Sequence, residues 1–293
     1  MEEAKPEAPG FKPRLSHLYP VILSLGATGI LGYPLLASSV VTATVTPFQG
    51  DTLSGASLNA LYFVVALGFT ATAMLFLVRR GKLRVLRQLV KVAVVIVCFT
   101  VALWYSSTVY FLLGVAFDDA LAFAILLATS IAVAVALGWF VFGKDKRRQL
   151  AGVVGLSALT GVFLGRSIDP LTALVLAGAL VVYDIVAVFK GPVGALARTV
   201  EVGDLPGAMF NYQELTIGMG DMVFYSLLAM TAMLFGLASF IGAGLGIVGG
   251  TFLGFKALQR FEMFPGLPFS LVFGVVGMFA GRLANFLLFG GSF

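Results

Sequence analysis

Residues 170–189 read PLTALVLAGALVVYDIVAVF, twenty residues in which Asp184 is the only charge. This length and composition match the roughly 20 apolar residues that an α-helix needs to cross the hydrocarbon core of a bilayer. Residues 215–237 repeat the pattern around a second lone acid, Asp221. A charged carboxylate in the middle of a membrane helix costs about 2.5 to 3.5 kcal/mol on insertion scales. The pair therefore indicates a function that needs carboxyl groups inside the membrane.

The whole chain has the composition of a membrane protein. Of its 293 residues, 59% are hydrophobic and 11% are charged, and the mean hydropathy is +1.02. Such a chain has too little polar surface to cover a soluble globule. The net charge of +5 comes from short basic clusters between apolar stretches, which is typical of membrane topology and not of a nucleic-acid-binding face. We expect a multi-pass protein of the cell membrane, embedded in the lipid bilayer, with no nucleic-acid partner.

Nine apolar stretches predict an all-α bundle of nine transmembrane helices. They are residues 18–45, 58–78, 92–113, 120–142, 150–168, 170–189, 215–237, 241–257 and 263–290. Length alone separates the seventh from the eighth, because the 41 residues of 215–255 would form a helix of about 61 Å, twice the hydrocarbon thickness. We expect one membrane-embedded domain over 1–293. It comprises a cytoplasmic tail (1–17), helices one to five (18–168) and helices six to nine (170–290), which carry both lone acids.

Basic residues lie almost entirely on one side of this bundle. The amino terminus and the connections after the even-numbered stretches carry sixteen Lys and Arg residues, whereas the other side carries only Arg166. Because cytoplasmic loops are enriched in Lys and Arg, the amino terminus is expected in the cytoplasm and the carboxyl terminus outside.

Small residues repeat in the last two stretches. The glycines are Gly242, Gly246, Gly250 and Gly254 in the eighth, and Gly274, Gly277 and Gly281 in the ninth. Such spacing exposes bare backbone along one helix face, which predicts close helix packing.

The two lone acids are expected at the same depth. Asp184 lies five residues before the cytoplasmic end of its stretch, and Asp221 six residues after the cytoplasmic start of its own. A helix rises 1.5 Å per residue, so the offsets are about 7.5 Å and about 9 Å from the same membrane surface. Consecutive antiparallel helices are usually neighbours, so the side chains should meet where cytoplasmic water can reach them. Two carboxyls in one site do not both ionise readily, and a protonated acid beside a carboxylate base is the starting state of aspartyl hydrolysis.

Other chemistries lack their residues. His17 is the only histidine and precedes the first stretch, while Cys98 is the only cysteine. Neither a histidine zinc site nor a Ser/His dyad can be assembled inside the membrane. We expect no metal and no cofactor.

Two alternatives to hydrolysis remain for the acids. Each aspartate could be a structural polar group satisfied by a neighbouring Tyr or Ser. The pair could also serve as relay or binding groups in a cation or proton channel or transporter.

Three short motifs carry a resemblance to a known family. Tyr183-Asp184, Gly218-Met219-Gly220-Asp221 and Pro265-Gly266-Leu267-Pro268 resemble, in order, the three signatures of the presenilin and signal peptide peptidase family of intramembrane aspartyl proteases. The chain is most similar to a compact microbial presenilin homologue. The resemblance implies that Asp184 and Asp221 are the catalytic pair. It implies substrate-binding roles for the other motif residues, Tyr183, Gly218, Met219, Gly220, Pro265, Gly266, Leu267 and Pro268.

The implied substrates are transmembrane helices of membrane proteins. Such a helix must be unwound locally before water reaches a peptide carbonyl. Gly218 and Gly220 would leave room for extended backbone, and Pro265 and Pro268 would free backbone groups to pair with it as an added strand. Simple helix packing or capping is the alternative role for these residues. Prepilin peptidases also use a G-x-G-D aspartate, but nine stretches and the Pro-Gly-Leu-Pro element argue against that group.

The chain departs from the family pattern at two places. Gly266 stands where the family usually has Ala, a small change that should preserve activity. The connection over residues 190–214 is shorter than the loop that presenilins cut during maturation, so we expect an intact chain. Its apolar residues suggest a position at the membrane interface. Within the family that the chain resembles, signal peptide peptidases have the opposite orientation, so the resemblance and a cytoplasmic amino terminus together imply presenilin-like substrates whose own amino terminus is outside.

Overall fold

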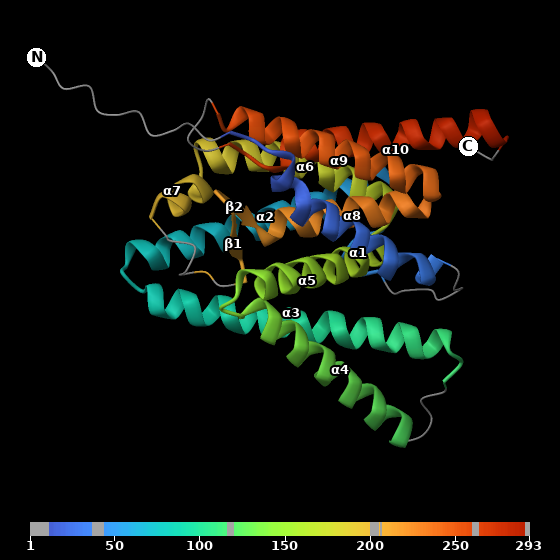
Figure 1. Ribbon diagram of the computed structural model, residues 1–293, viewed down its shortest axis with the longest axis horizontal. Helices are drawn as coiled ribbons and strands as arrows, with labels where there is room; N and C mark the ends of the chain where they lie inside the picture. Colours follow the sequence, from blue (N-terminus) through green and yellow to red (C-terminus); the bar gives the residue numbers. More distant parts are fainter. Residues whose placement is uncertain are drawn as a thin grey trace, which may run out of the picture.

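The fold is a bundle of long helices with one small hairpin, seen in a computed structural model that describes residues 12–36, 44–115, 120–199, 205, 207–259 and 264–290 (Figure 1). A 3-10 turn η1 (Leu15–Leu18) leads into the first helix. The long helices are α1 (Tyr19–Leu36), α2 (Leu53–Arg79), α3 (Leu83–Leu112), α4 (Ala120–Val141), α5 (Lys146–Ser167), α6 (Pro170–Phe189), α9 (Leu237–Ala257) and α10 (Leu267–Phe289). The short elements are α7 (Pro192–Thr199), β1 (Met209–Tyr212), β2 (Leu215–Gly218) and α8 (Met219–Leu234).

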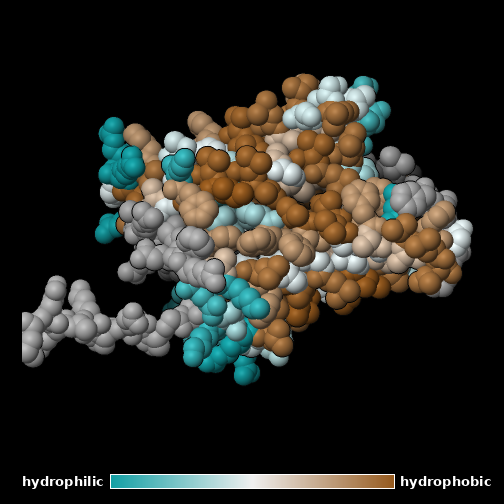
Figure 2. Space-filling model, turned by 90° about the horizontal axis from the view of Figure 1, so that it is seen from above, coloured by the Kyte–Doolittle hydropathy of each residue, from teal (hydrophilic) through white to brown (hydrophobic). Residues whose placement is uncertain are grey.

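The helices match the expected polytopic membrane architecture. Within the described ranges, eight helices are long and apolar enough to cross a membrane, and α8 is a shorter apolar helix. The bundle therefore has eight to nine candidate membrane helices. A broad hydrophobic surface covers the middle of the face in Figure 2, and hydrophilic residues gather mainly at one end. In the first predicted span, residues 37–43 lie outside the described residues, and residues 44–45 are not helical. In the ninth, residue 263 lies outside them, and the helix begins at Leu267, four residues after the expected start.

The start of the seventh predicted span is wrong. Residues 215–218 form strand β2, which pairs antiparallel with β1, and helix α8 begins only at Met219. In β2 the side chains of Leu215 and Ile217 are buried while Thr216 is exposed, the alternation of a half-buried strand. Hydropathy does not distinguish a short apolar strand from the first turn of a helix. The bundle is therefore all-α except for this hairpin.

The predicted break between the seventh and eighth spans is confirmed, with different bounds. Helix α8 ends at Leu234 and α9 begins at Leu237, four residues before the expected start. Gly236 between them has φ 112°, a conformation that favours glycine. The chain reverses at this glycine, which hydropathy alone did not mark.

Helix α8 lies at the centre of the bundle. It packs against α1, α5, α6, α9 and α10, and its residues from Tyr225 to Met233 are all buried. Gly161 and Gly165 of α5 allow the closest approach, since a Cβ on either would collide with Ser226 or Met230. Its 16 residues span only about 24 Å, which suffices because protein and not lipid surrounds the helix.

Helices α9 and α10 pack through their glycines, as predicted. Gly242, Gly246 and Gly250 of α9 face the backbone carbonyls of Gly277, Phe273 and Phe269. Gly254 differs from the other three, because no described atom lies within 4 Å of where its Cβ would be. The first three glycines therefore serve packing, and the fourth leaves open space.

Two neighbouring glycines of α9 test this packing. Gly242→Ala should lower the free energy of unfolding by about 1 to 3 kcal/mol, because its methyl group overpacks against α10. Gly244, with no described atom within 4 Å of its Cβ position, is the matched control. Gly244→Ala should be neutral or stabilising, since Ala favours a helix by about 1 kcal/mol over Gly. The measurement is unfolding of the purified protein in detergent; equal effects of both variants would contradict the packing.

Candidate active site

Asp184 lies in the last turns of α6, five residues before its end at Phe189, as expected. The side chain is half-buried. Its Oδ2 atom accepts a hydrogen bond of 2.9 Å from the backbone N–H of Leu267, the first residue of α10. The amide of Gly266 also faces this carboxyl group. The start of α10 thus anchors the carboxyl at the end of α6.

Asp221 is the third residue of α8 and lies in its first turn. It was expected six residues inside the span, and the difference comes from strand β2, which takes up the four residues before α8. Its half-buried carboxyl lies beside two glycines. A Cβ on Gly266 would be 2.7 Å from Asp221 Oδ2, and a Cβ on Gly218 would be 3.6 Å from the same atom. Glycine at position 266 therefore leaves the space that this carboxyl occupies.

The two lone acids share one site. The turn formed by residues 265–268 adjoins both of them, because Leu267 binds Asp184 and Gly266 lies against Asp221. The two carboxyl groups are near enough to interact electrostatically. Helix α6 packs more extensively on α2 and α10 than on α8. The two acids are therefore held near each other mainly through the start of α10, and less by direct packing of α6 on α8.

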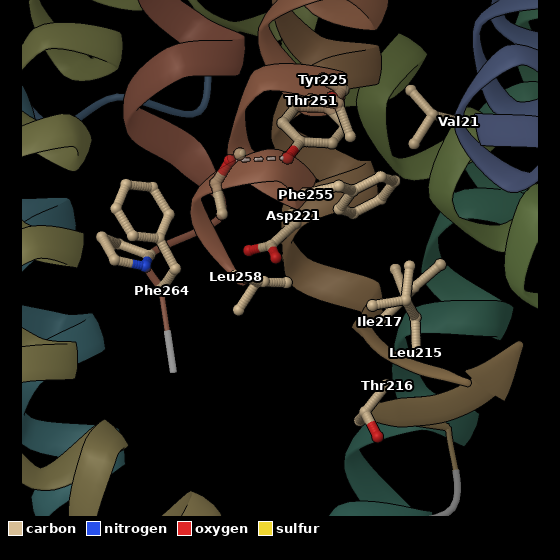
Figure 3. A pocket seen from close by; sticks show the side chains of 13 residues that line it. Val21, Leu215, Thr216, Ile217, Asp221, Tyr225, Thr251, Phe255, Leu258 and Phe264 are labelled. Carbon is tan, nitrogen blue, oxygen red and sulfur yellow. Dashed lines mark hydrogen bonds between the residues drawn. The ribbon is translucent and has the colours of Figure 1, made fainter. Parts of the chain in front are cut away.

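A pocket of about 100 Å³ opens on the Asp221 side of the site (Figure 3). Strand β2, helices α8 and α9 and the turn before α10 form most of its wall. The lining residues are Val21, Leu215, Thr216, Ile217, Asp221, Tyr225, Thr251, Gly254, Phe255, Leu258, Phe264, Pro265 and Gly266. The Asp221 carboxyl points into the pocket and is its charged group, while most of the wall is apolar. The pocket can therefore hold an apolar side chain next to a carboxyl.

Four of the eight predicted substrate-binding residues lie at this site. Pro265 and Gly266 line the pocket, Gly218 precedes α8 beside Asp221, and Leu267 provides its amide. The Leu267 side chain itself is buried in the core, 4% exposed.

The other four are placed around it. Tyr183 turns its ring toward Gly68 of α2, and Met219 packs against core residues behind the hairpin. Gly220 is exposed beside Asp221, with no described atom within 4 Å of its Cβ position. Pro268 occupies the first turn of α10, where its missing N–H removes no helical hydrogen bond.

Three hydroxyl residues of the site were missed by the sequence analysis. Tyr225 Oη donates to the Gly266 carbonyl at 3.0 Å, the bond drawn at Tyr225 in Figure 3. Ser270 Oγ lies 3.1 Å from Tyr225 Oη, and Thr251 Oγ1 lies 3.0 Å from Ser270 Oγ. Tyr225 follows Asp221 by four residues and Ser270 follows Gly266 by four, so helical spacing from the motifs could have found both. Thr251 carries no such signal.

The arrangement has the groups that acid–base catalysis requires. Paired carboxyls beside a partly exposed cavity can hold and activate a water molecule between them. In the described part of the chain, no group of three or more His, Cys, Asp or Glu side chains could hold a metal ion.

Comparison with known proteins identifies the family. A family model described as "Signal-peptide peptidase, presenilin aspartyl protease" matches residues 21–210, which include Asp184 and end before Asp221. No curated protein matches the chain.

Two solved structures have a similar fold. Both are of a presenilin family intramembrane aspartate protease, in C222 and P2 crystal forms, and both have a TM-score of 0.60. The first is 20% identical and covers 91% of this chain and 97% of its own; the second is 22% identical, with coverages of 94% and 99%. The similarity thus extends over nearly the whole bundle. Because the family model also matches well over half of the chain, this protein belongs to the signal peptide peptidase and presenilin family of intramembrane aspartyl proteases.

Proposed function

We propose that Asp184 and Asp221 are the catalytic pair of this protease, and that they hydrolyse peptide bonds within transmembrane helices of membrane-protein substrates. The observation that carries the proposal is that one turn, residues 265–268, adjoins both carboxyl groups. These acids come from helices that α7 and the hairpin separate along the chain, yet both side chains lie against this turn. A structural role for each acid alone would not require this convergence.

Catalysis follows from one proton shared by the pair. The ionised carboxyl takes a proton from a bound water molecule, which attacks the peptide carbonyl of the substrate. The protonated carboxyl stabilises the developing oxyanion and then protonates the leaving amine. Because such a pair titrates as a unit, the proton belongs to the pair in the resting enzyme.

The backbone around Asp221 suits an extended substrate. Strand β2 leads directly into the turn that carries Asp221, and Gly220 leaves open space beside it. Pro265 has no N–H to donate within a helix, and the backbone at this turn, just before α10, is non-helical. A substrate segment unwound at this point can add to the hairpin as a strand and place an apolar side chain in the pocket. Gly218, Gly220, Pro265 and Gly266 are then the substrate-contacting residues.

The remaining motif residues support the site from behind. Tyr183, Met219 and Leu267 have side chains directed to α2 or the core, and Pro268 lies in the first turn of α10. These four residues therefore support substrate binding by packing behind the site. Among them, Leu267 contacts a catalytic acid through its amide.

The proposed orientation has a cytoplasmic amino terminus and an external carboxyl terminus, in the cell membrane. The start of α1, the α2–α3 and α4–α5 connections, α7 and the hairpin lie at the same end of the bundle (Figure 1). The two connections and the helix ends beside them carry nine basic residues, five over 79–87 and four over 144–148, which supports this end as the cytoplasmic one. The whole chain acts as one domain, with residues 170–290 supplying the catalytic groups.

The catalytic pair is tested by two conservative substitutions. Asp184→Asn and Asp221→Asn keep the size of the side chain and remove its titratable proton, so each should lower the cleavage rate by a factor of about 10³ or more. The measurement is mass spectrometry of fragments from single-span peptides incubated with purified protein in detergent. Asp145→Asn, in the α4–α5 connection, is the matched control and should cleave normally. Cleavage at the wild-type rate by the Asp184→Asn or the Asp221→Asn variant would contradict the mechanism. Addition of EDTA should not change the cleavage rate, because the mechanism uses no metal ion.

The substrate position is tested at two exposed glycines. Gly220→Leu should reduce kcat/KM by about tenfold or more, because its side chain fills the space proposed for the substrate backbone. Gly178→Leu on α6 is the control, since it too is exposed with no described atom within 4 Å of its Cβ position. It should change neither cleavage nor unfolding. Equal kcat/KM values for the two variants would remove Gly220 from the substrate path.

The orientation is tested by cysteine labelling of intact cells. In a Cys98→Ala background, Leu113→Cys at the end of α3 should react with a membrane-impermeant thiol reagent. Lys82→Cys at its start should react only after the membrane is permeabilised. Both positions are exposed, so the reverse pattern of labelling would mean the opposite orientation.

A further inference from the structure

A row of hydroxyl groups connects α9 to the catalytic end of α6. Thr251 Oγ1 lies 3.0 Å from Ser270 Oγ, Ser270 Oγ lies 3.1 Å from Tyr225 Oη, and Tyr225 Oη donates to the Gly266 carbonyl at 3.0 Å. The three residues come from three helices, α9, α10 and α8. Their exposed fractions are 5%, 0% and 3%. Water is therefore poorly placed to replace any of these bonds.

The row ends on the peptide group that binds Asp184. The Gly266 carbonyl and the Leu267 N–H belong to the same peptide unit. The carbonyl accepts from Tyr225, and the N–H donates to Asp184 Oδ2 at 2.9 Å. A hydrogen bond accepted by the carbonyl polarises the peptide and strengthens its N–H as a donor. The hydroxyl of Tyr225 thus fixes both the position and the donor strength of the Leu267 amide.

Two of the three hydroxyl hydrogens have competing acceptors. Thr251 Oγ1 is also 2.8 Å from the Ile247 carbonyl, and Ser270 Oγ is 3.0 Å from the Gly266 carbonyl. One arrangement runs in a single direction, in which Thr251 donates to Ser270, Ser270 to Tyr225 and Tyr225 to Gly266. Bonds aligned in one direction reinforce one another. In the other arrangement, Thr251 donates to the Ile247 carbonyl of its own helix and gives no hydrogen bond to Ser270.

We propose that Thr251, Ser270 and Tyr225 are positioning residues, which form a unidirectional hydroxyl chain that orients the Gly266–Leu267 peptide and, through its N–H, the carboxyl of Asp184. This inference rests on the proposed catalytic role of Asp184. The chain does not touch the scissile bond. It fixes the geometry of an acid that acts in the chemical step, so its loss lowers kcat and leaves KM unchanged.

The test is a double-mutant cycle between the two ends of the chain. Tyr225→Phe should lower kcat about fivefold to tenfold, and Thr251→Val about threefold, as expected for the loss or weakening of one buried hydrogen bond. Thr251→Val preserves the shape of the side chain, and Thr251→Ser restores the hydroxyl and should recover the wild-type kcat. In the Tyr225→Phe background, Thr251→Val should have a smaller effect than in the wild type, because only the direct contact of 3.0 Å between Ser270 Oγ and the Gly266 carbonyl then links the chain to the peptide.

Thr231→Val is the matched control for removal of a buried hydroxyl. Thr231 lies on α8 with an exposed fraction of 0%, and no hydrogen bond reaches its Oγ1 in the described structure. Its kcat and KM should equal those of the wild type. Unfolding in detergent shows whether each variant is folded. If the Val variant is unstable, comparing Thr251→Ala with Thr251→Ser also measures the effect of removing the hydroxyl on kcat.

Three results would overturn the chain. The first is a wild-type kcat for Thr251→Val. The second is a double variant in which the effects of Thr251→Val and Tyr225→Phe on kcat multiply. The third is a Thr251→Val variant whose KM rises while kcat stays unchanged, which would mean that Thr251 contacts the substrate in the pocket. If the Asp184→Asn protein is inactive while Thr251→Val is fully active, only the chain fails. If the Asp184→Asn protein cleaves at the wild-type rate, the catalytic assignment itself fails.

Discussion

The hydrogen bond from the Leu267 amide to Asp184 joins the start of α10 to the end of α6. A helix leaves its first N–H groups without intrahelical partners, and at membrane depth such donors need an acceptor within the protein. Pro265 and Pro268 carry no N–H, so the free donors of this turn are concentrated at Gly266 and Leu267. Both amides face the Asp184 carboxyl. These contacts therefore give hydrogen-bond partners both to the free N–H groups of the turn and to the Asp184 carboxyl.

The short, central helix α8 determines what surrounds the other acid. Because α8 is enclosed by five helices, it can begin inside the bundle and leave the preceding residues free to form strand β2. Irregular backbone at membrane depth is tolerated where it is buried in protein or lines a cavity, and β2 lines the pocket next to Asp221. A full-length helix at this place would have buried Asp221 two turns deep and removed the extended backbone beside it. The shortness of α8 thus creates the cavity that the chemistry needs.

Hydropathy and charge predicted the bundle because lipid imposes one length and one composition on every spanning helix. The two acids stood out for the same reason, and the structure places both beside the turn before α10. The sequence could not reveal β2, since a segment of four residues is too short for its hydropathy to distinguish a strand from a helical turn. The sequence also does not show which motif side chains point into the site, so Tyr183 and Met219, which point away from it, were predicted together with residues that face it. The contact of Thr251 with Ser270 joins two helices across 19 residues of sequence, a separation at which no local sequence pattern predicts a contact.

The glycines of α9 connect packing to the site. Gly250 precedes Thr251 by one residue, and a Cβ on Gly250 would lie 2.8 Å from the Cα of Ser270. Only backbone-to-backbone contact lets side chains as short as those of Thr251 and Ser270 meet at 3.0 Å. One turn further along α9, Gly254 no longer contacts α10, and the space it leaves belongs to the pocket beside Asp221. The same four-residue repeat therefore holds the two helices together over most of its length and opens a cavity where it reaches the acids.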